Sequence, residues 1–239
     1  MSAPFKTWTV LPHGQLTPVG DNILTVVGEI HMPIGDFPRR MTVVRLKDGR
    51  LIIFSAIALD DAEMARIEAF GTPAFLIVPC DRHRLDAPIF KQRYPALQVI
   101  TPGGGWHKVA EAVPVDATWA DFGDPAVRLV DVAGTGAHEA ALEVTGPDGL
   151  TLIVNEIIGS IHGAKGLRGW LLKVMGFAGE EPQVPAAVKL QFAKGRAELA
   201  AQLRAWADRP DLKRIIVSHG DIIDSDPQGV LRRLAETLN

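Results

Sequence analysis

Short apolar runs separated by Pro, Gly and charged residues dominate much of the chain. Runs rich in β-branched residues predict strands, because such side chains suit a pleated, half-buried surface. Predicted strands in the first half are residues 22–29, 41–46, 51–55, 74–78 and 98–101. Those in the second half are residues 127–132, 140–145, 150–155 and 214–218.

Helical segments lie between and after these strands. Asp60 is placed to cap a helix that ends at Gly71, since its carboxylate can accept free backbone N–H groups. The other predicted helices are residues 87–93, 165–175, 188–208 (Ala-rich) and 228–238. Two strand-rich halves, each followed by helices, indicate a layered α/β or α+β protein.

Composition narrows the class of protein. The chain has 239 residues, a formal net charge of -3 and one cysteine. We expect one domain (1–239), no binding to nucleic acid and no intrachain disulfide. The N-terminal segment lacks a basic region followed by an apolar core, and the longest nearly apolar stretch, 51–59, is too short to span a membrane. These features favour a cytoplasmic protein without membrane contact.

Two histidines, His83 and His219, each stand just after a short apolar run. A strand followed by a loop with a histidine delivers an imidazole to the edge of a sheet. Two histidines placed in this way, far apart in the sequence, predict a site that forms on folding and indicate a metal-binding site.

The order of these elements resembles the metallo-β-lactamase superfamily from about residue 22 to residue 238. That resemblance implies an α+β fold, the four-layer αββα sandwich. The last histidine of the family's His-x-His-x-Asp-His loop matches His83, and Tyr94-Pro95 follows a short helix as in the family. The family's final His-Gly matches His219 and Gly220.

The other ligand positions of the family carry different residues. The first loop has Val78, Cys80 and Arg82 where the family has His, His and Asp. Gly134 replaces a metal-binding histidine, Asn155-Glu156 replaces the Gly-Asp pair, and Phe54-Ser55 stand where an aspartate is expected. The resemblance thus implies a reduced set of metal ligands.

The first hypothesis is a hydrolase of unknown small-molecule substrate with a single metal ion. His83, His219 and Glu156 would hold zinc, iron or manganese, because two imidazoles and one carboxylate with an open position form a known catalytic zinc pattern. Glu156 could instead act as general base. Cys80 is a possible fourth ligand that would close the site and make it structural.

The second hypothesis is a catalytically inactive, metal-free protein on the same fold. Arg82 would then anchor an anion in the pocket, because a guanidinium binds carboxylate or phosphate through two parallel hydrogen bonds. For the hydrolase, Glu156 and Arg82 are the candidate catalytic residues, and no cofactor other than a metal is expected.

The segment 159–185 reads as a helical insertion beside the predicted site. Residues 167, 171, 174 and 175 fall on one helical face, so the insertion could be a lid, a homodimer contact or ordinary packing. Nearby, His138 could line the pocket and Asp221 could border it. Asp226 is expected to cap the final helix. The glycines at 103–105 read as a simple loop that no helix follows.

Overall fold

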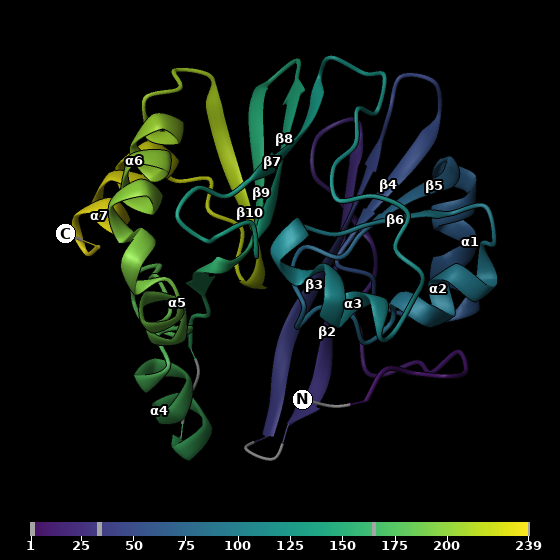
Figure 1. Cartoon of the computed structure of the whole chain (residues 1–239), viewed down its shortest axis with the longest axis horizontal. Helices are drawn as coiled ribbons and strands as arrows, with labels where there is room; N and C mark the ends of the chain where they lie inside the picture. The colour runs from purple at the N-terminus through teal and green to yellow at the C-terminus, as the bar shows by residue number, and fades with distance from the viewer. Residues whose placement is uncertain (1–2, 33–34, 164–165, 239) are drawn as a thin grey trace. The chain divides into compact units, whose positions relative to one another are not determined.

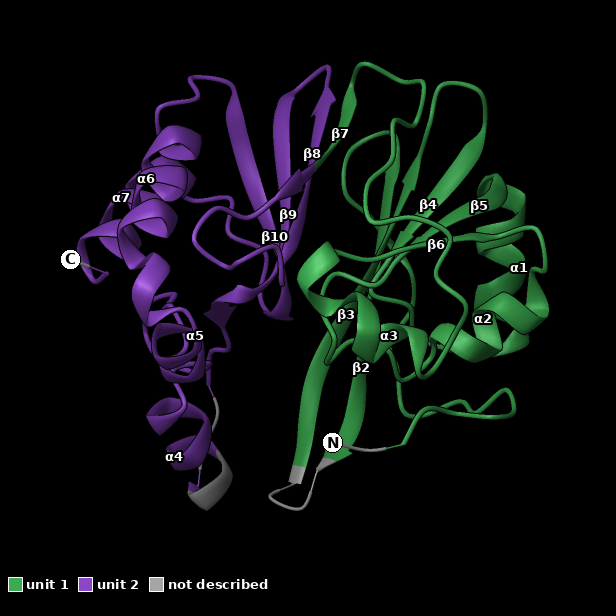
Figure 2. Cartoon of the chain, viewed as in Figure 1, with its two compact units in different colours: residues 1–129 green, residues 130–239 purple. Residues whose placement is uncertain are grey.

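The computed structural model describes residues 3–32, 35–163 and 166–238. The chain divides into two compact units, Met1–Leu129 and Val130–Asn239, which Figure 2 colours green and purple. The boundary falls within strand β7 (Val127–Asp131). The expectation of a single domain over 1–239 stays a prediction.

The first unit is built on a six-stranded sheet with strands in sequence order (Figure 1). Its strands are β1 (Thr17–Pro18), β2 (Ile23–Met32), β3 (Gly35–Arg45), β4 (Arg50–Phe54), β5 (Thr72–Ile77) and β6 (Gln98–Ile100). Strands β1 to β4 pair antiparallel, whereas β4, β5 and β6 pair parallel. The carboxyl ends of β4 and β5 therefore lie at the same edge of the sheet.

Helices cover one face of this sheet. They are α1 (Asp61–Phe70), α2 (Ala87–Arg93) and α3 (Trp106–Ala110), preceded by a short 3₁₀ turn, η1 (Gly103–Gly105). Val43, Ile53 and Leu76 of the sheet share a buried apolar core with Met64 of α1 and Phe90 of α2. This burial is the main favourable term that holds the layer together.

The predicted boundaries of α1 and α2 are confirmed. The Asp60 carboxylate accepts the Glu63 N–H at 2.9 Å, and the Gly71 N–H bonds the last turn. The expectation that no helix follows the glycines at 103–105 is wrong, because α3 begins at Trp106.

The second unit holds a four-stranded sheet in the order β10-β9-β8-β7. Strands β8 (Ala140–Gly146) and β9 (Gly149–Ser160) form a hairpin, and β10 (Leu212–Gly220) lies parallel to β9. The helices are α4 (Gly166–Val174), α5 (Ala186–Gln191), α6 (Arg196–Ala207) and α7 (Pro227–Glu236), with the 3₁₀ turn η2 (Ala193–Gly195) before α6. Leu152 and Val217 of the sheet share a core with Leu203 of α6 and Leu231 of α7.

Strand β9 is longer than predicted and irregular. It was expected to end at residue 155, but it continues to Ser160. Between the pairs Val217–Val154 and His219–Gly159, two steps along β10 correspond to five along β9. The extra residues form a bulge that contains Glu156, and bulges often re-aim side chains beside functional sites.

The prediction of one continuous helix over 188–208 is wrong. Instead, α5 ends at Gln191 and α6 starts at Arg196, with η2 between them. Gly195 lies at this interruption, and the backbone packs closely there, because a Cβ would meet the Gly134 carbonyl oxygen at 2.0 Å. Helix propensity cannot register such a tertiary contact.

The insertion over 159–185 contains α4, and the expected start of that helix at Lys165 lies outside the described residues. Leu172 and Gly169 are buried, whereas Val174 is exposed. The exposure of Val174 leaves the shared apolar face a prediction, and the side chain of Leu167 lies outside what the structure describes. The insertion is tied to its own unit, because Gly159 of β9 and Gln183 exchange two backbone hydrogen bonds of 2.9 Å.

Among the described residues, no helix combines the length and apolarity needed to cross a bilayer.

Candidate metal centre

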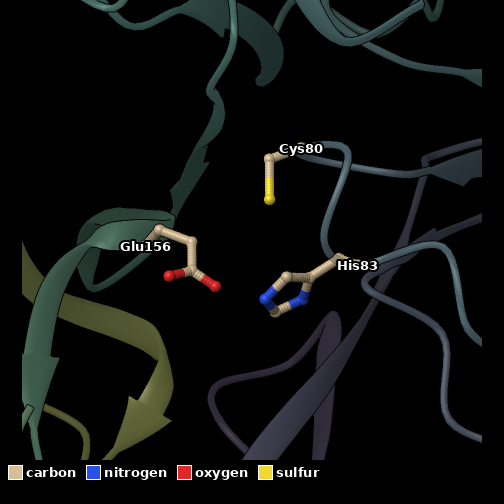
Figure 3. Close-up of side chains that lie close together, drawn as sticks. All are labelled: Cys80, His83 and Glu156. Atoms are coloured by element: carbon tan, nitrogen blue, oxygen red, sulfur yellow. The ribbon is translucent and has the colours of Figure 1, made fainter. Parts of the chain in front are cut away.

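The first pair of candidate ligands lies on the segment between β5 and α2. Cys80 is buried and His83 is half-buried, and Figure 3 shows both on this loop. The Cys80 Sγ and a ring nitrogen of His83 lie within 4.8 Å of one another. A tight turn brings them together, because the His83 N–H donates to the Cys80 carbonyl at 3.2 Å.

Ser55 holds the His83 ring from the neighbouring strand end. Its Oγ lies 2.6 Å from His83 Nδ1. Ser55 is buried and has a φ of 59°, a left-handed conformation that non-glycine residues adopt only when their surroundings enforce it. When the proton is on Nδ1, the ring donates to Ser55 and presents Nε2 as a metal ligand, the usual arrangement of metal-binding histidines.

A buried ion pair between Arg39 and Asp86 lies at the end of the loop that carries Cys80 and His83. Arg39 on β3 donates through Nη1 to Asp86, and the other carboxylate oxygen of Asp86 accepts the Ala58 N–H at 3.0 Å. Burial raises the pKa of Asp86, and the charge of Arg39 and the Ala58 N–H oppose that rise. The charged carboxylate thus depends on these two partners.

The second pair of candidate ligands lies within the other unit. Glu156 is on the bulge of β9, as Figure 3 shows, and His219 is near the end of β10. His219 Nε2 lies 3.2 Å from Glu156 Oε1, and both side chains are buried. Phe177 packs edge-on against the His219 ring with centroids 5.4 Å apart, which restricts the ring's orientation.

Glu139 holds the bulge that carries Glu156. Its carboxylate accepts a hydrogen bond from the Asn155 side chain at 3.0 Å and one from the Glu156 N–H at 3.3 Å. Glu139 is almost fully buried. A buried carboxylate bound to backbone and side-chain donors fixes the direction in which Glu156 leaves the strand.

A third histidine ligand would not fit at Gly134. Gly134 has a φ of +78°, and a Cβ there would meet the Gly195 carbonyl oxygen at 2.0 Å and the Leu199 nitrogen at 2.7 Å. The start of α6 therefore occupies the space that a side chain at this position would need. Within this unit, the replacement of histidine by glycine is tied to helix packing.

The remaining candidates take other places. Arg82 is half-buried on the same loop as His83. His138 lies beside Phe192, with ring centroids 6.4 Å apart. The Asp221 carboxylate lies 2.8 Å from His162 Nδ1. Asp226 caps α7 as expected, by accepting the Gly229 N–H at 3.0 Å.

Each of the two pairs, Cys80 with His83 and Glu156 with His219, offers donor atoms that a divalent ion accepts. Two imidazoles and a carboxylate, with a thiol in reserve, are donors that zinc prefers. Ser55 behind His83 and Glu139 behind Glu156 supply the outer contacts that orient metal ligands.

Comparison with known proteins places the fold in one class. No protein-family model and no curated protein matches the chain. Several solved metallo-β-lactamases match it along nearly its whole length. The FIM-1 enzyme from Pseudomonas aeruginosa in its mono-zinc form has a TM-score of 0.63 at 14% identity, covering 95% of this chain and 96% of that chain.

Two further matches agree with it. DIM-1 metallo-β-lactamase exposed to ceftazidime has a TM-score of 0.63 at 15% identity and covers 97% of this chain and 100% of its own. A metallo-β-lactamase from Hirschia baltica has a TM-score of 0.60 at 11% identity, with 94% and 98% covered. The chain therefore has the metallo-β-lactamase fold, and the predicted fold class is confirmed.

Three residues of the site were missed by the sequence prediction. Ser55 was noted only as a replacement for an aspartate, and its bond to His83 was not foreseen. Glu139 and Asp86 carried a weak signal, since each is an acidic residue beside apolar neighbours that proves to be buried. Such positions rarely hold a carboxylate unless it is paired.

Ser55→Ala is expected to lower zinc affinity about 10–100-fold, the usual cost of removing the partner of a metal-binding histidine. The fold should persist, since a single hydrogen bond contributes only about 0.5–1.5 kcal/mol net. Calorimetric zinc titration together with thermal unfolding measures both quantities. Unchanged affinity in the folded variant would show that Ser55 does not orient a ligand.

Proposed function

We propose that this protein is a metal-dependent hydrolase of a small-molecule substrate that uses one divalent ion, with zinc as the first candidate. His83, Glu156 and His219 would hold the ion, and Cys80 is the reserve donor. The observation that carries the proposal is the pairing of ligands: Cys80 with His83 in one unit and Glu156 with His219 in the other.

Neither pair is sufficient alone. Catalytic zinc sites use three protein ligands and keep one position open. The full ligand set of His83, Glu156 and His219 is what the metallo-β-lactamase resemblance implies. The His219–Glu156 contact supports the proposal, because it keeps a carboxylate and an imidazole side by side in a buried setting. A buried cation needs such nearby donors to offset the loss of its hydration.

A bound divalent ion would supply a water of lowered pKa, near 7 for zinc, for attack on the substrate. The chain's own residues would orient the reacting groups. Glu139 fixes the direction of Glu156 as a ligand, and the buried surroundings of His219 limit the access of bulk water. Arg82 would bind an anionic group of the substrate, because its guanidinium is permanently charged and planar.

Zinc titration of the protein tests the proposal. Calorimetry on metal-free protein is expected to give one equivalent bound, with the affinity lost in both His83→Ala and Glu156→Ala. One variant from each unit is needed because a site in a single unit would lose affinity in only one of them. Cys80→Ser separates the two forms of the site: unchanged affinity leaves an open, hydrolytic site, and a large loss indicates a closed, structural one.

The metal-free alternative is a distinct outcome of the same titration. Protein that binds no zinc but binds inorganic phosphate, with the phosphate binding lost in Arg82→Ala, would be an anion-binding protein. That result would overturn the hydrolase proposal.

We also propose a homodimer formed through α4, supported by two exposed apolar side chains, Trp170 (59%) and Val174 (60%). Trp170→Glu is expected to shift the mass measured by light scattering from dimer to monomer. The matched control is Trp119→Glu in the other unit, whose tryptophan is equally exposed at 59%. A monomeric wild-type protein would contradict the proposal.

A further inference from the structure

The His83 segment has no helix or strand of its own. Between β5 and α2 it is held by individual hydrogen bonds and by the buried side chains of Val78 and Leu85. At its start, the Val78 N–H donates to Ile100 at 2.9 Å, and at its middle His83 contacts Ser55. Its far end is fixed by the side-chain contacts of Asp86.

Asp86 joins three separate segments of the first unit. One carboxylate oxygen accepts the Ala58 N–H from the stretch that follows β4, and the other pairs with Arg39 on β3. Ser55 lies in the same stretch as Ala58, three residues earlier. Two side-chain hydrogen bonds, Ser55 to His83 and Asp86 to Ala58, thus connect the same two irregular segments, and Arg39 fixes them to the sheet.

The Asp86 carboxylate makes these long-range contacts instead of capping the helix that it precedes. Asp86 stands at the N-cap position of α2, where an aspartate ordinarily accepts a backbone N–H of the first turn, yet it makes no side-chain capping bond. Asp60 and Asp226, at the same position of α1 and α7, both make that bond. The long-range contacts of Asp86 replace the cap.

The unpaired donors of Arg39 also indicate that the Arg39–Asp86 ion pair does not serve to stabilise the fold. The Arg39 side chain is about nine-tenths buried, and its Nε and Nη2 have no hydrogen-bond partner among the described residues. Unsatisfied buried donors destabilise a fold, and an apolar pair of similar size is often as stable as a buried ion pair. Groups that lower stability in this way are typical of functional positions.

We infer that Arg39 and Asp86 are positioning residues that hold the His83 ring in its ligand orientation through the Ala58–Ser55 stretch. The inference rests on the proposed role of His83 as a metal ligand. Neither Arg39 nor Asp86 touches substrate or metal in this scheme, and both act through the backbone of the loop and through Ser55.

The test separates positioning from stability with a charge-removing pair of substitutions. Asp86→Asn alone leaves Arg39 buried without a counter-charge, and we expect the unfolding equilibrium constant to rise by at least about 100-fold. The double variant Arg39→Met/Asp86→Asn removes both charges and keeps an acceptor for Ala58. We expect it to recover wild-type stability.

Two readouts then decide the inference in the double variant. In metal-free protein, ¹⁵N NMR of the His83 ring is expected to change from one tautomer to a mixture, and zinc affinity is expected to fall at least tenfold. The matched control is Glu63→Gln/Arg66→Met, which removes another ion pair of the same unit that binds Leu16 instead. It should leave the His83 signal unchanged.

A stable double variant with a single His83 tautomer and wild-type zinc affinity would overturn the inference. Should the wild-type protein bind no zinc, the proposed function fails, but the NMR readout still decides whether Arg39 and Asp86 orient His83.

Discussion

Replacing His83 by alanine is expected to reduce zinc affinity at least 100-fold, equivalent to about 2.7 kcal/mol of binding free energy. The imidazole is one of three proposed ligands, and its loss exceeds the effect of losing an orienting partner such as Ser55. Thermal unfolding should report the same change: zinc at about 100 times its wild-type dissociation constant adds roughly 2.7 kcal/mol to wild-type stability, and this gain should fall to about 0.4 kcal/mol or less in the variant.

His107→Ala is the matched control for this experiment. His107 belongs to the same unit, is exposed, and stacks edge-on against Trp106. We expect wild-type zinc affinity from it. Equal losses in the two variants would mean that zinc binds histidines unselectively, which contradicts a specific site at His83.

Gly134→Ala is expected to destabilise the protein by roughly 2–5 kcal/mol, the second large effect. A Cβ at a φ of +78° costs about 1–2 kcal/mol, and its overlap with the Gly195 carbonyl adds about 1–3 kcal/mol of overpacking. Denaturant unfolding measures the total. For the same reason, Gly134→His should fail to add a metal ligand.

Gly49→Ala separates the two contributions. Gly49 has a similar φ of +85°, but nothing lies within 4 Å of a Cβ built there. We expect only the conformational cost, about 1–2 kcal/mol. If the two variants were equally stable, the contact between Gly134 and Gly195 would not constrain the chain.

The strands and first helices could be predicted because their signals are local. Val43, Ile53 and Leu76 lie in β-branched or continuous apolar runs, and Asp60 precedes a helix that it caps. The predictions failed where tertiary contacts decide the structure. Residues 188–208 have good helix propensity, but the helix is interrupted where the backbone packs closely at Gly195. The bulge around Glu156 depends on a bond from Glu139 that no periodicity reveals.

The sequence likewise predicted some residues of the candidate site and missed others. His83 and His219 stand out because each follows an apolar run. Ser55 and Asp86 did not, since Ser55 reaches His83 only after two parallel strands bring their carboxyl ends to one sheet edge. Polar residues that orient a ligand carry no spacing signature, and only the folded chain identifies them.

The measurement that tests the central proposal most directly is X-ray absorption at the zinc edge on protein loaded with one equivalent of zinc. A shared site of His83, Glu156 and His219 predicts two imidazole nitrogens at about 2.0–2.1 Å and a carboxylate oxygen at about 2.0–2.2 Å. A sulfur at about 2.3 Å would add Cys80 and indicate a closed, structural site. Zinc surrounded by oxygen alone, or no retained zinc, would contradict the proposal.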